Sequence, residues 1–346
     1  MHNILILSAG TRNKVVEFFR KECAGNGRVI ATDCSPDAPA IYEADQAYIV
    51  PRIDAPGYID RILEICAKEK VSGVFSLIDP ELSLLAKNRE RFEAAGVTPV
   101  VSSYELCETS LDKYRMAETF QRFGLRTARC YLTLEEFTEA RERGEVDFPV
   151  FVKPRCGSAS LGISAVDNEE LLTALMHAQP SLMIQEYMHG QEYGADVYID
   201  LITGKCTQIF LKKKIKMRAG ETDKSVSAHD TALFEEIRRF VEGAGYRGMI
   251  DIDLFCEEGE WIFSEVNPRF GGGYPHAYAC GVNFPAALLA NLEGKAGEPA
   301  IGAYPDDVYM MKYNEIMIRD GGELCARRAP GDGVQTGQQA AAGSKA

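Results

Sequence analysis

The chain has 346 residues, of which 46% are hydrophobic and 26% are charged. This balance is that of a globular protein and excludes disordered, collagen-like and coiled-coil classes; at roughly 150 residues per domain, the length predicts about two domains. The 51 acidic and 38 basic residues give a net charge of −13, which argues against a general nucleic-acid-binding surface but leaves room for a local basic pocket.

The sequence gives no sign of membrane insertion or export. No run of about 18 apolar residues is present. The opening MHNILILSAG has no basic segment or later cleavage site, so we predict a first strand rather than a signal peptide. The ten cysteines form no Cys-x-x-Cys pair, and the five histidines do not cluster with them. We therefore expect a cytoplasmic protein without a disulfide framework or a zinc site.

Residues 1–108 alternate strand and helix signals, which predicts a parallel, doubly wound sheet with helices on both faces. Strands are expected at 4–7, 29–32, 47–50, 74–78 and 97–101. Helices are expected at 13–23, 58–68 and 80–95. The first turn holds one glycine where a dinucleotide-binding fingerprint needs three. We interpret Asp33 as a polar strand end and expect no NAD site.

After residue 108 the pattern changes to shorter strands. We predict a helix at 110–123 with Ser110 as its N-cap. Further helices are predicted at 169–177, 231–244 and 285–291. Strands are predicted at 148–153, 182–185, 194–200, 208–216, 248–255 and 261–266. The last two are expected to pair as an antiparallel hairpin. Residues 321–346 are rich in Gly, Ala and Gln without periodicity, and we expect a disordered tail.

Lys153 ends a predicted strand and precedes a loop of small residues, 157–162. Glycines let backbone amides approach phosphate oxygens, and the lysine ammonium adds a compact charge. The loop lacks the Gly-Lys-Ser/Thr ending of a Walker A motif. A solvated lysine before an ordinary turn is the structural alternative.

Two further segments have both a functional and a structural interpretation. The extended stretch 184–193 suits the edge of an adenine, or is simply a strand and a turn. Lys212, Lys214 and Lys216 alternate along one predicted strand and therefore share a face. That face is either solvated or bound to an anion.

The most specific feature is a group of polar residues at the ends of two neighbouring predicted strands. Glu265 and Asn267 point to the same side of one strand, and Asp253 lies on the other. Two carboxylates and an amide oxygen are suited to Mg²⁺. Arg269 is placed to reach a transferring phosphoryl group, and glycines 271–273 permit close approach of a ligand. An acidic hairpin closed by a salt bridge to Arg269 is the structural alternative.

The order of a strand lysine, a glycine loop, an extended hinge and a Glu-x-Asn-Pro-Arg ending is similar to that of the ATP-grasp superfamily. The ending looks most like the carbamoyl-phosphate synthase large-subunit branch. The resemblance implies a Rossmann-like, doubly wound α/β pre-ATP-grasp domain over 1–108. A two-lobed α+β ATP-grasp domain would follow, with a small lobe over 109–188 and a large lobe over 189–320, before the tail.

The resemblance also implies a set of ATP-binding residues. Lys113 and Lys153 would reach the phosphates, and Ser158 and Gly162 would belong to the loop that closes over them. The adenine hinge and the ribose contact are implied at Glu186, Tyr187, Met188 and Glu192.

By the same resemblance, Asp253, Glu265 and Asn267 would ligate two Mg²⁺ ions, with Mn²⁺ as a substitute and Glu265 as the bridge. Arg269 would act with Lys153 on the transferred phosphoryl group. Two carboxylates, an amide and an arginine in this order indicate catalysis rather than nucleotide binding alone.

A single unit of this length resembles a stand-alone ligase, because carbamoyl-phosphate synthases of the large-subunit type use two units. We therefore expect a ligase that consumes ATP and joins a carboxylate to an amine, a thiol or ammonia through an acyl phosphate, releasing ADP and phosphate. A kinase or carboxylase on the same scaffold and a nucleotide-binding module without turnover are the alternatives.

The sequence says little about the two small-molecule substrates. Arg218, Tyr274 and His276 lie near the predicted site along the chain. We hypothesise that Arg218 pairs with the carboxylate of the acid. The turns at 8–13 and 79–81 are expected to complete the pocket wall. We expect no nucleic-acid or membrane partner, and many members of the family are homodimers.

Overall fold

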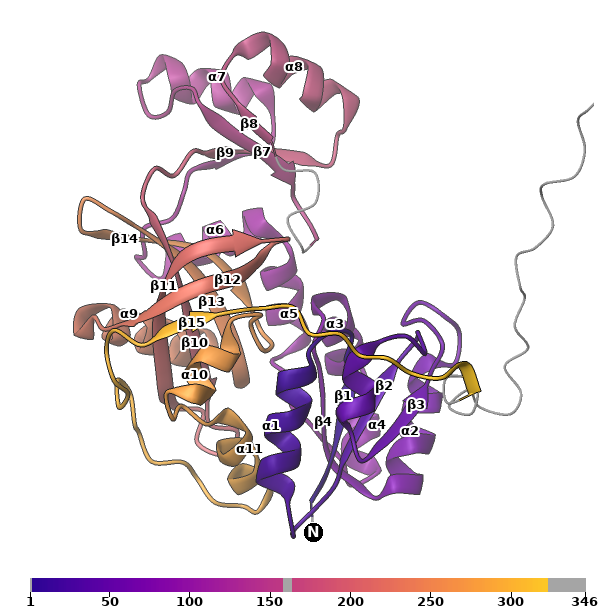
Figure 1. The fold of residues 1–346 in the computed structure, drawn as a ribbon. Helices are drawn as coiled ribbons and strands as arrows, with labels where there is room; N and C mark the ends of the chain where they lie inside the picture. Colours follow the sequence, from indigo (N-terminus) through magenta and orange to yellow (C-terminus); the bar gives the residue numbers. More distant parts are fainter. Residues whose placement is uncertain (1, 158–163, 323–346) are drawn as a thin grey trace, which may run out of the picture.

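The structure is a computed structural model that describes residues 2–157 and 164–322 (Figure 1). Its N-terminal domain is a sheet of 5 parallel strands in the order β3-β2-β1-β4-β5. The strands are β1 (Asn3–Leu7), β2 (Val29–Asp33), β3 (Gln46–Ile49), β4 (Val71–Ser76) and β5 (Thr98–Pro99). The helices are α1 (Asn13–Cys23), η1 (Pro39–Glu43), α2 (Tyr58–Glu69), α3 (Asp79–Lys87) and α4 (Arg89–Ala94). The predicted doubly wound α/β fold is confirmed.

The strand order reverses between β1 and β4, and this position directs attention to the loops that follow them. In open parallel sheets, ligands bind outside the carboxyl ends of the strands at such a reversal. The loop after β1 leads to Arg12, the N-cap of α1. The loop after β4 leads to Asp79, the first residue of α3.

Two predicted helices differ from the structure because polar side chains interrupt them. The helix expected at 80–95 divides into α3 and α4 at Asn88, whose side chain donates to the carbonyl of Leu84. The helix expected at 110–123 begins later, as α6 (Lys113–Arg122), and Asp112 rather than Ser110 caps it by accepting from the amides of Tyr114 and Arg115. Ser110 instead lies inside α5 (Tyr104–Leu111).

The small lobe stands apart from the rest of the molecule at the top of Figure 1. Its 4-stranded sheet has the order β6-β9-β7-β8. The elements are β6 (Cys130–Tyr131), α7 (Leu134–Glu142), β7 (Val150–Pro154), β8 (Ser164–Val166), α8 (Glu169–Ala178) and β9 (Leu182–Glu186). A hydrophobic core of its own, which includes Phe137, Val150 and Ile184, holds the lobe together.

The large lobe is a 6-stranded antiparallel sheet in the order β14-β13-β10-β11-β12-β15. Its strands are β10 (Gln191–Ile199), β11 (Cys206–Arg218), β12 (Glu221–Ala228), β13 (Gly248–Glu257), β14 (Glu260–Asn267) and β15 (Tyr309–Met311). Its helices are α9 (Thr231–Ala244), α10 (Tyr274–Ala279) and α11 (Phe284–Leu292). The predicted β13–β14 hairpin is confirmed. The polar sequence ETDKSVSA of β12 gave no apolar alternation from which to predict a strand.

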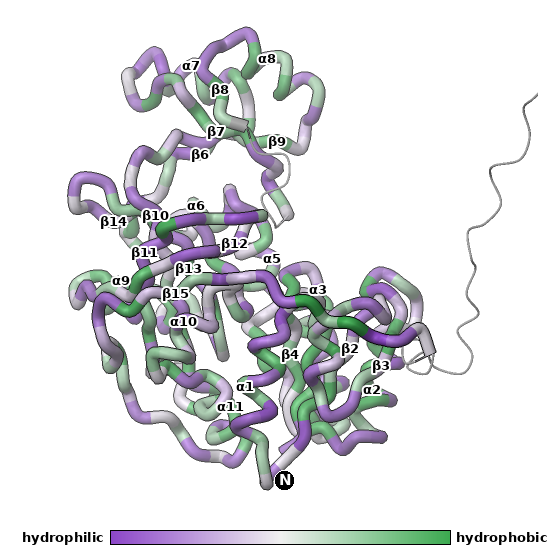
Figure 2. The backbone as a smooth tube through the Cα atoms, in the orientation of Figure 1, coloured by the Kyte–Doolittle hydropathy of each residue, from purple (hydrophilic) through white to green (hydrophobic). Residues whose placement is uncertain are grey.

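The large lobe and the N-terminal domain share one hydrophobic core. Phe19 and Phe75 of the N-terminal domain contact Phe270 of the large lobe, with ring centroids 5.9 and 5.6 Å apart. In Figure 2, green stretches of α1 and α11 lie side by side, in keeping with the contacts between these helices. The small lobe is therefore the part that can move most independently, since its core is separate.

No helix in the described part of the chain is long and apolar enough to cross a membrane. The nine cysteines that the structure describes are all free, and Cys156 is exposed. The domain boundaries at residues 108, 188 and 320 stay predictions, and the tail from residue 323 lies outside the described residues.

Candidate active site

A cavity of about 300 Å³ lies where the N-terminal domain, the small lobe and the large lobe meet. Most of its charged lining residues come from motifs that the sequence singled out. The charged residues in the lining are Arg12, Lys113, Lys153, Lys214, Glu221, Asp251, Asp253, Glu265 and Arg269. Asn267, Cys156 and Gly157 also line the cavity, together with glycines of the run 271–273.

Two lysines reach the cavity from the small lobe and from the helix that precedes it. The side chain of Asp112 binds Arg155 at 2.8 Å, which ties the start of α6 to the end of β7. Lys113 consequently lies beside the loop after β7, and its Nζ donates to the carbonyl of Gly157 at 2.5 Å. Lys153 is buried, and burial lowers the pKa of its ammonium while the nearby Glu265 opposes that shift.

The acidic side of the cavity follows from the register of two strands. Asp253 of β13 is opposite Glu265 of β14, and Asp251 is opposite Asn267. A register shift between Asp253 and Leu254 interrupts the pairing, which then continues to Glu257 opposite Glu260. Burial raises the pKa of Glu265, and the cations Lys113 and Lys153 oppose that effect. The Nζ of Lys113 is 3.9 Å from an oxygen of Glu265.

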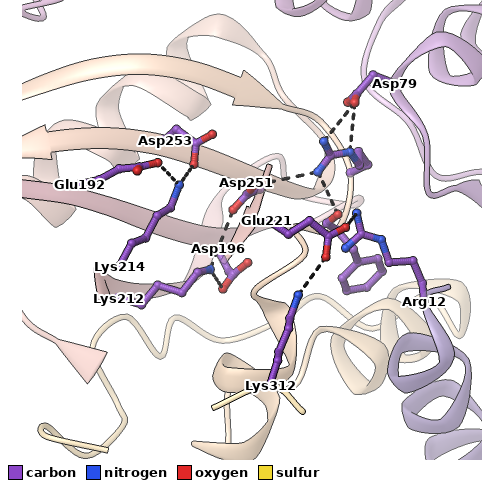
Figure 3. Close-up of polar contacts among 12 residues, drawn as sticks. Arg12, Asp79, Glu192, Asp196, Lys212, Lys214, Glu221, Asp251, Asp253 and Lys312 are labelled. Carbon is purple, nitrogen blue, oxygen red and sulfur yellow. Dashed lines mark hydrogen bonds and ion pairs between the residues drawn. The ribbon is translucent and has the colours of Figure 1, made fainter. Parts of the chain in front are cut away.

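Two of the lysines of β11 are buried, and protein carboxylates hold both of them (Figure 3). The Nζ of Lys214 is 2.7 Å from Glu192 and 2.5 Å from Asp253. The Nζ of Lys212 is 2.5 Å from Asp196 and 3.9 Å from Asp251. Lys216 on the same strand is exposed. The shared face that we expected therefore holds for Lys212 and Lys214, whose anions belong to the protein itself, but not for Lys216, because a register shift between Lys214 and Lys216 breaks the alternation.

These contacts set the protonation of two groups at the cavity. Burial alone would lower the pKa of Lys214, but the attraction of Asp253 and Glu192 keeps it above the usual lysine value. Burial, reinforced by the charge of Asp253, raises the pKa of Asp251 to about 7. Lys214 is consequently a permanent cation at this wall of the cavity.

Two arginines enter the cavity at the junction with the N-terminal domain. Arg269 donates to an oxygen of Asp79 at 3.0 and 3.3 Å and to the carbonyl of Phe270 at 3.1 Å. The second arginine, Arg12, forms an ion pair with Glu221 at 2.8 Å. Arg12 lies in the turn 8–13 and Asp79 in the turn 79–81, so both turns that we expected to complete the pocket wall do reach the site.

The glycine run after Arg269 makes room for charged side chains. A Cβ atom on Gly271 would lie 2.5 Å from an oxygen of Asp251, and one on Gly272 would lie 2.7 Å from Nη1 of Arg12. Such distances are far below van der Waals contact, so a larger residue would displace these groups. We predicted that these glycines would let a ligand approach closely, but charged side chains of the protein itself occupy the space beside Gly271 and Gly272.

The predicted hinge residues lie outside this cavity lining. Glu186 accepts from the backbone amide of Arg129 at 3.0 Å, and Tyr187 stacks on Phe151 with ring centroids 5.1 Å apart. Both line a separate hollow of about 440 Å³, and Met188 follows them in the connection from β9 to β10. Glu192 joins the site only through Lys214. Ser158 and Gly162 lie outside the described residues.

The three predicted substrate residues do not line the cavity. Arg218 is half-exposed and contacts Asp223 at 3.1 Å and Asn314 at 3.3 Å. Tyr274 is fully buried, and its hydroxyl donates to the carbonyl of Val282 at 3.1 Å. His276 is also buried, and burial lowers its pKa to about 4. Their side chains are held by other parts of the protein and not presented to a ligand.

The described residues contain no group of three or more His, Cys, Asp or Glu side chains arranged to hold a metal ion. The predicted set is of a different composition, with two carboxylates and the amide of Asn267. Asp253 and Glu265 face each other across the hairpin and both line the cavity. These hard oxygen donors fit Mg²⁺ in type.

Sequence reasoning expected the turn 8–13 at the pocket wall but did not single out Arg12 within it, and it gave Lys214 no partner. Arg12 is distant in sequence from Glu221, so only the fold reveals their pairing. The alternation of lysines along β11 was a usable signal for Lys214. It did not show that Glu192 and Asp253, on the neighbouring strands β10 and β13, are the partners.

Comparison with known proteins places both parts of the chain. Residues 4–100 match the sequence profile of the PylC-like N-terminal domain, and residues 110–273 match that of the ATP-grasp domain. The 3-methyl-D-ornithine–L-lysine ligase of Methanosarcina acetivorans is 24% identical over 308 residues, which cover 86% of this chain and 75% of that protein. The arginine-specific large chain of carbamoyl phosphate synthase from Bacillus subtilis is 20% identical over 65% of this chain. Only 22% of that large chain is covered.

Solved structures with low sequence identity have the same fold. The biotin carboxylase domain of 2-oxoglutarate carboxylase from Hydrogenobacter thermophilus has a TM-score of 0.71 at 17% identity, covering 89% of this chain and 73% of that one. N5-carboxyaminoimidazole synthetase from Staphylococcus aureus has a TM-score of 0.68 at 15% identity, covering 87% and 79%. The chain is therefore an ATP-grasp protein, in which a PylC-like N-terminal domain precedes the ATP-grasp domain.

Proposed function

We propose that this protein is an ATP-dependent ligase that joins a carboxylate to an amine through an acyl phosphate. One observation carries the proposal, which is the meeting of Lys113, Lys153, Asp253, Glu265 and Arg269 in a single cavity between three parts of the fold. Phosphoryl transfer needs positioned charges more than covalent help from the protein. This cavity supplies charges of both signs at the junction of the domains.

The oxygen donors of the β13–β14 hairpin would hold Mg²⁺. Asp253, Glu265 and Asn267 are the proposed ligands for two ions, with Mn²⁺ as a substitute. When bound, the metal supplies positive charge against the ATP phosphates. Lys113 lies 3.9 Å from Glu265 and Lys153 lines the same cavity, and both lysines would bind the phosphates directly.

The reaction we propose is balanced in two steps. A carboxylate oxygen of the acid attacks the γ-phosphorus of ATP, and the bond from that phosphorus to the oxygen of ADP breaks. The amine nitrogen then attacks the acyl carbon, the bond from carbon to the phosphate oxygen breaks, and inorganic phosphate leaves. The amine loses a proton, and the products are an amide, ADP and phosphate.

Arg269 is the residue best placed to stabilise the transferring phosphoryl group. Its guanidinium is largely buried and is fixed by Asp79 and by the carbonyl of Phe270. A cation that is already oriented needs no reorganisation when negative charge develops during the reaction. The burial of the group also strengthens its electrostatic effect, because less water screens it.

The names of related proteins support this reaction class. They include the 3-methyl-D-ornithine–L-lysine ligase and a D-alanine–D-alanine ligase of Alcanivorax borkumensis that is 29% identical over 45% of this chain. A carboxylase or carbamoyl-phosphate-synthase-like phosphorylation is the second candidate, favoured by the fold shared with the biotin carboxylase domain. A homodimeric state and a cytoplasmic location stay predictions.

ADP release and hydroxylamine trapping test the proposed function together. The protein is given Mg-ATP, hydroxylamine and single acids from a panel that includes amino acids, hydroxy acids, formate and bicarbonate. Hydroxylamine converts an acyl phosphate into a coloured hydroxamate. We expect ADP and hydroxamate in equal amounts, lost in Lys153→Ala and retained in the matched control Lys295→Ala, an exposed lysine paired with Glu293.

Other outcomes reject the proposal. ADP formed without hydroxamate would favour the carboxylase or kinase alternative. Bound ATP without ADP for every acid would indicate a nucleotide-binding module.

A further inference from the structure

A C-terminal strap, defined as residues 305–320, crosses from the large lobe to the N-terminal domain (Figure 1). It begins along the sheet edge, where β15 pairs with β12 through Lys224 and Met311. It reaches the N-terminal domain at Arg319, whose guanidinium lies 5.2 Å from the ring centroid of Tyr42. The strap lies beyond the residues that match the ATP-grasp profile, 110–273, so the profile assigns it no role.

The strap contributes one end of a three-residue ion cluster, which we name the substrate corner. Its members are Arg12, Glu221 and Lys312 (Figure 3). Arg12 is 2.8 Å from one oxygen of Glu221, and Lys312 is 2.9 Å from the other. Each residue comes from a different segment: the loop after β1, the first residue of β12 and the strap. The two oxygens of Glu221 are thus held from opposite sides.

A ligand in the cavity can reach the substrate corner. Arg12 and Glu221 both line the cavity, and their side chains are 21% and 38% exposed. In contrast, Lys212 and Asp196 are each 1% exposed and serve the fold. Gly272 lines the cavity directly beside Arg12 and Glu221, and its lack of a side chain keeps this wall open.

The charges of the corner define what kind of acid fits it. Arg12 and Arg269 attract the carboxylate of a substrate, but that carboxylate would then lie close to Glu221 and Asp251. If Arg12 binds this carboxylate, the oxygen of Glu221 that Arg12 held loses its cation, and a plain acid offers no replacement. A substrate with an ammonium next to its carboxylate places an anion against Arg12 and a cation against Glu221. An α-amino acid has this arrangement.

On the basis of the proposed function, we propose that the substrate corner selects an α-amino acid as the acid to be activated. Arg12 directs the carboxylate towards Arg269, and Glu221 accepts hydrogen bonds from the ammonium. Lys312 is a positioning residue, because it holds Glu221 from the strap side and does not line the cavity. The strap therefore takes part in substrate recognition.

Matched pairs of acids test the substrate class. Each α-amino acid is compared with the α-hydroxy acid of the same skeleton, such as alanine with lactate and aspartate with malate, in both enantiomers. ADP and hydroxamate are measured with Mg-ATP and hydroxylamine. We expect at least one amino acid to be used with a kcat/KM about 100-fold or more above that of its hydroxy partner, because the hydroxy acid supplies no cation to the oxygen of Glu221 that Arg12 gives up.

Two results would overturn the inference, and they differ in what they say of the proposed function. Equal or better use of hydroxy acids, formate or bicarbonate would reject amino-acid selection while keeping the acyl-phosphate reaction. No hydroxamate with any acid would reject the reaction and the inference together.

Variants of the corner test the role of Lys312 on the preferred amino acid. Glu221→Gln and Lys312→Met should each raise the KM for the amino acid by about tenfold or more, because each weakens a charge-assisted contact. The KM for ATP and kcat should stay within about twofold. Lys312→Arg should restore the KM, and Lys295→Met serves as the matched control. If Lys312→Met and Glu221→Gln fold and keep the same KM for the amino acid, the substrate corner is a structural ion cluster and does not recognise the substrate.

Discussion

The two sides of the cavity are assembled from different kinds of segment. On the hairpin side, Asp253, Glu265 and Asn267 come from two adjacent strands, so strand register brings them together, and Arg269 follows in the next turn. In the substrate corner, Arg12, Glu221 and Lys312 are far apart in sequence and meet only through packing of the domains and the strap. The first arrangement is local, and the second depends on the whole fold.

The ion pairs of the two sides also differ in solvent exposure. The buried pairs contribute to the stability of the fold, whereas the exposed pair is available to bind a ligand. Lys212 and Lys214 beneath the hairpin side are buried, and their partners are carboxylates of neighbouring strands. Removing one partner of a buried pair leaves an uncompensated charge. Arg12 and Glu221 are partly exposed, so their pairing adds less to stability and leaves them available to a ligand. Substitutions on the two sides should therefore have separable effects.

The largest effect is expected from Lys212→Met. This change leaves Asp196 and Asp251 opposite each other on paired strands without the cation between them. We expect the free energy of unfolding of the large lobe to fall by about 3–5 kcal/mol, the typical result of breaking a buried ion pair. Urea denaturation monitored by far-UV circular dichroism measures the change.

Two further variants control this prediction. Lys216→Met alters an exposed lysine of the same strand and should change stability by no more than about 0.5 kcal/mol. The double variant Asp196→Asn with Lys212→Met removes both partners and should recover part of the loss. If Lys212→Met were as stable as the wild type, the buried pair would not distinguish the two sides of the cavity.

Arg269→Ala should have the next largest effect, which we expect on the rate. We expect kcat for ADP formation to fall by about 10²–10³, equivalent to about 2.7–4 kcal/mol of transition-state stabilisation, as for the loss of one preorganised oxyanion donor. Steady-state kinetics with saturating Mg-ATP and the preferred acid give the value. The loss should appear in kcat, because the charge of the group is needed most as the phosphoryl group transfers.

Asp79→Asn is the companion variant for Arg269. It keeps the shape of the side chain but weakens the contact that orients the guanidinium at 3.0 Å. A smaller fall in kcat than in Arg269→Ala is expected. Unchanged turnover in Arg269→Ala would remove this residue from the reaction and leave the structural salt bridge as its role.

His276 provides a pH-dependent comparison. Its pKa is lowered to about 4 by burial, and its ring contacts Ser225 and the carbonyl of Val308 at the start of the strap region. The unfolded chain, with an ordinary histidine pKa near 6.5, binds a proton that the folded chain rejects between pH 6.5 and 4. Stability contributed by the neutral ring is therefore present above pH 6.5 and lost as the pH falls towards 4.

We expect wild-type protein to lose about 2–3 kcal/mol more stability than His276→Gln between pH 7 and pH 4.5. Urea denaturation at both pH values measures this difference. His177→Gln, which changes an exposed histidine of α8, is the matched control and should follow the wild type. If wild type and His276→Gln lost the same stability between the two pH values, the buried ring would not be a source of this pH dependence.

The contrast between local and assembled features also explains what the sequence could predict. The parallel sheet, the hairpin and helix α9 follow from periodicity, and the grouping of Asp253, Glu265 and Asn267 follows from positions two residues apart on paired strands. β12 and β15 are short or polar, so their pairing depends on neighbours that a sequence pattern does not identify. Arg12 reaches Glu221 only because the N-terminal domain shares a core with the large lobe.

Arg218→Ala should have the smallest effect and separates nearness in sequence from nearness in space. Arg218 lies three residues before Glu221 in the chain, yet its side chain contacts Asp223 and Asn314, and it does not line the cavity. Because the side chain is half-exposed, its loss should change stability by less than about 1 kcal/mol. The KM for the acid should stay within about twofold, whereas Arg12→Ala should raise it at least tenfold through loss of a charged hydrogen bond. The same steady-state assay measures both variants. A larger rise in the acid KM for Arg218→Ala than for Arg12→Ala would indicate that Arg218 binds the substrate carboxylate, at the outer end of β11.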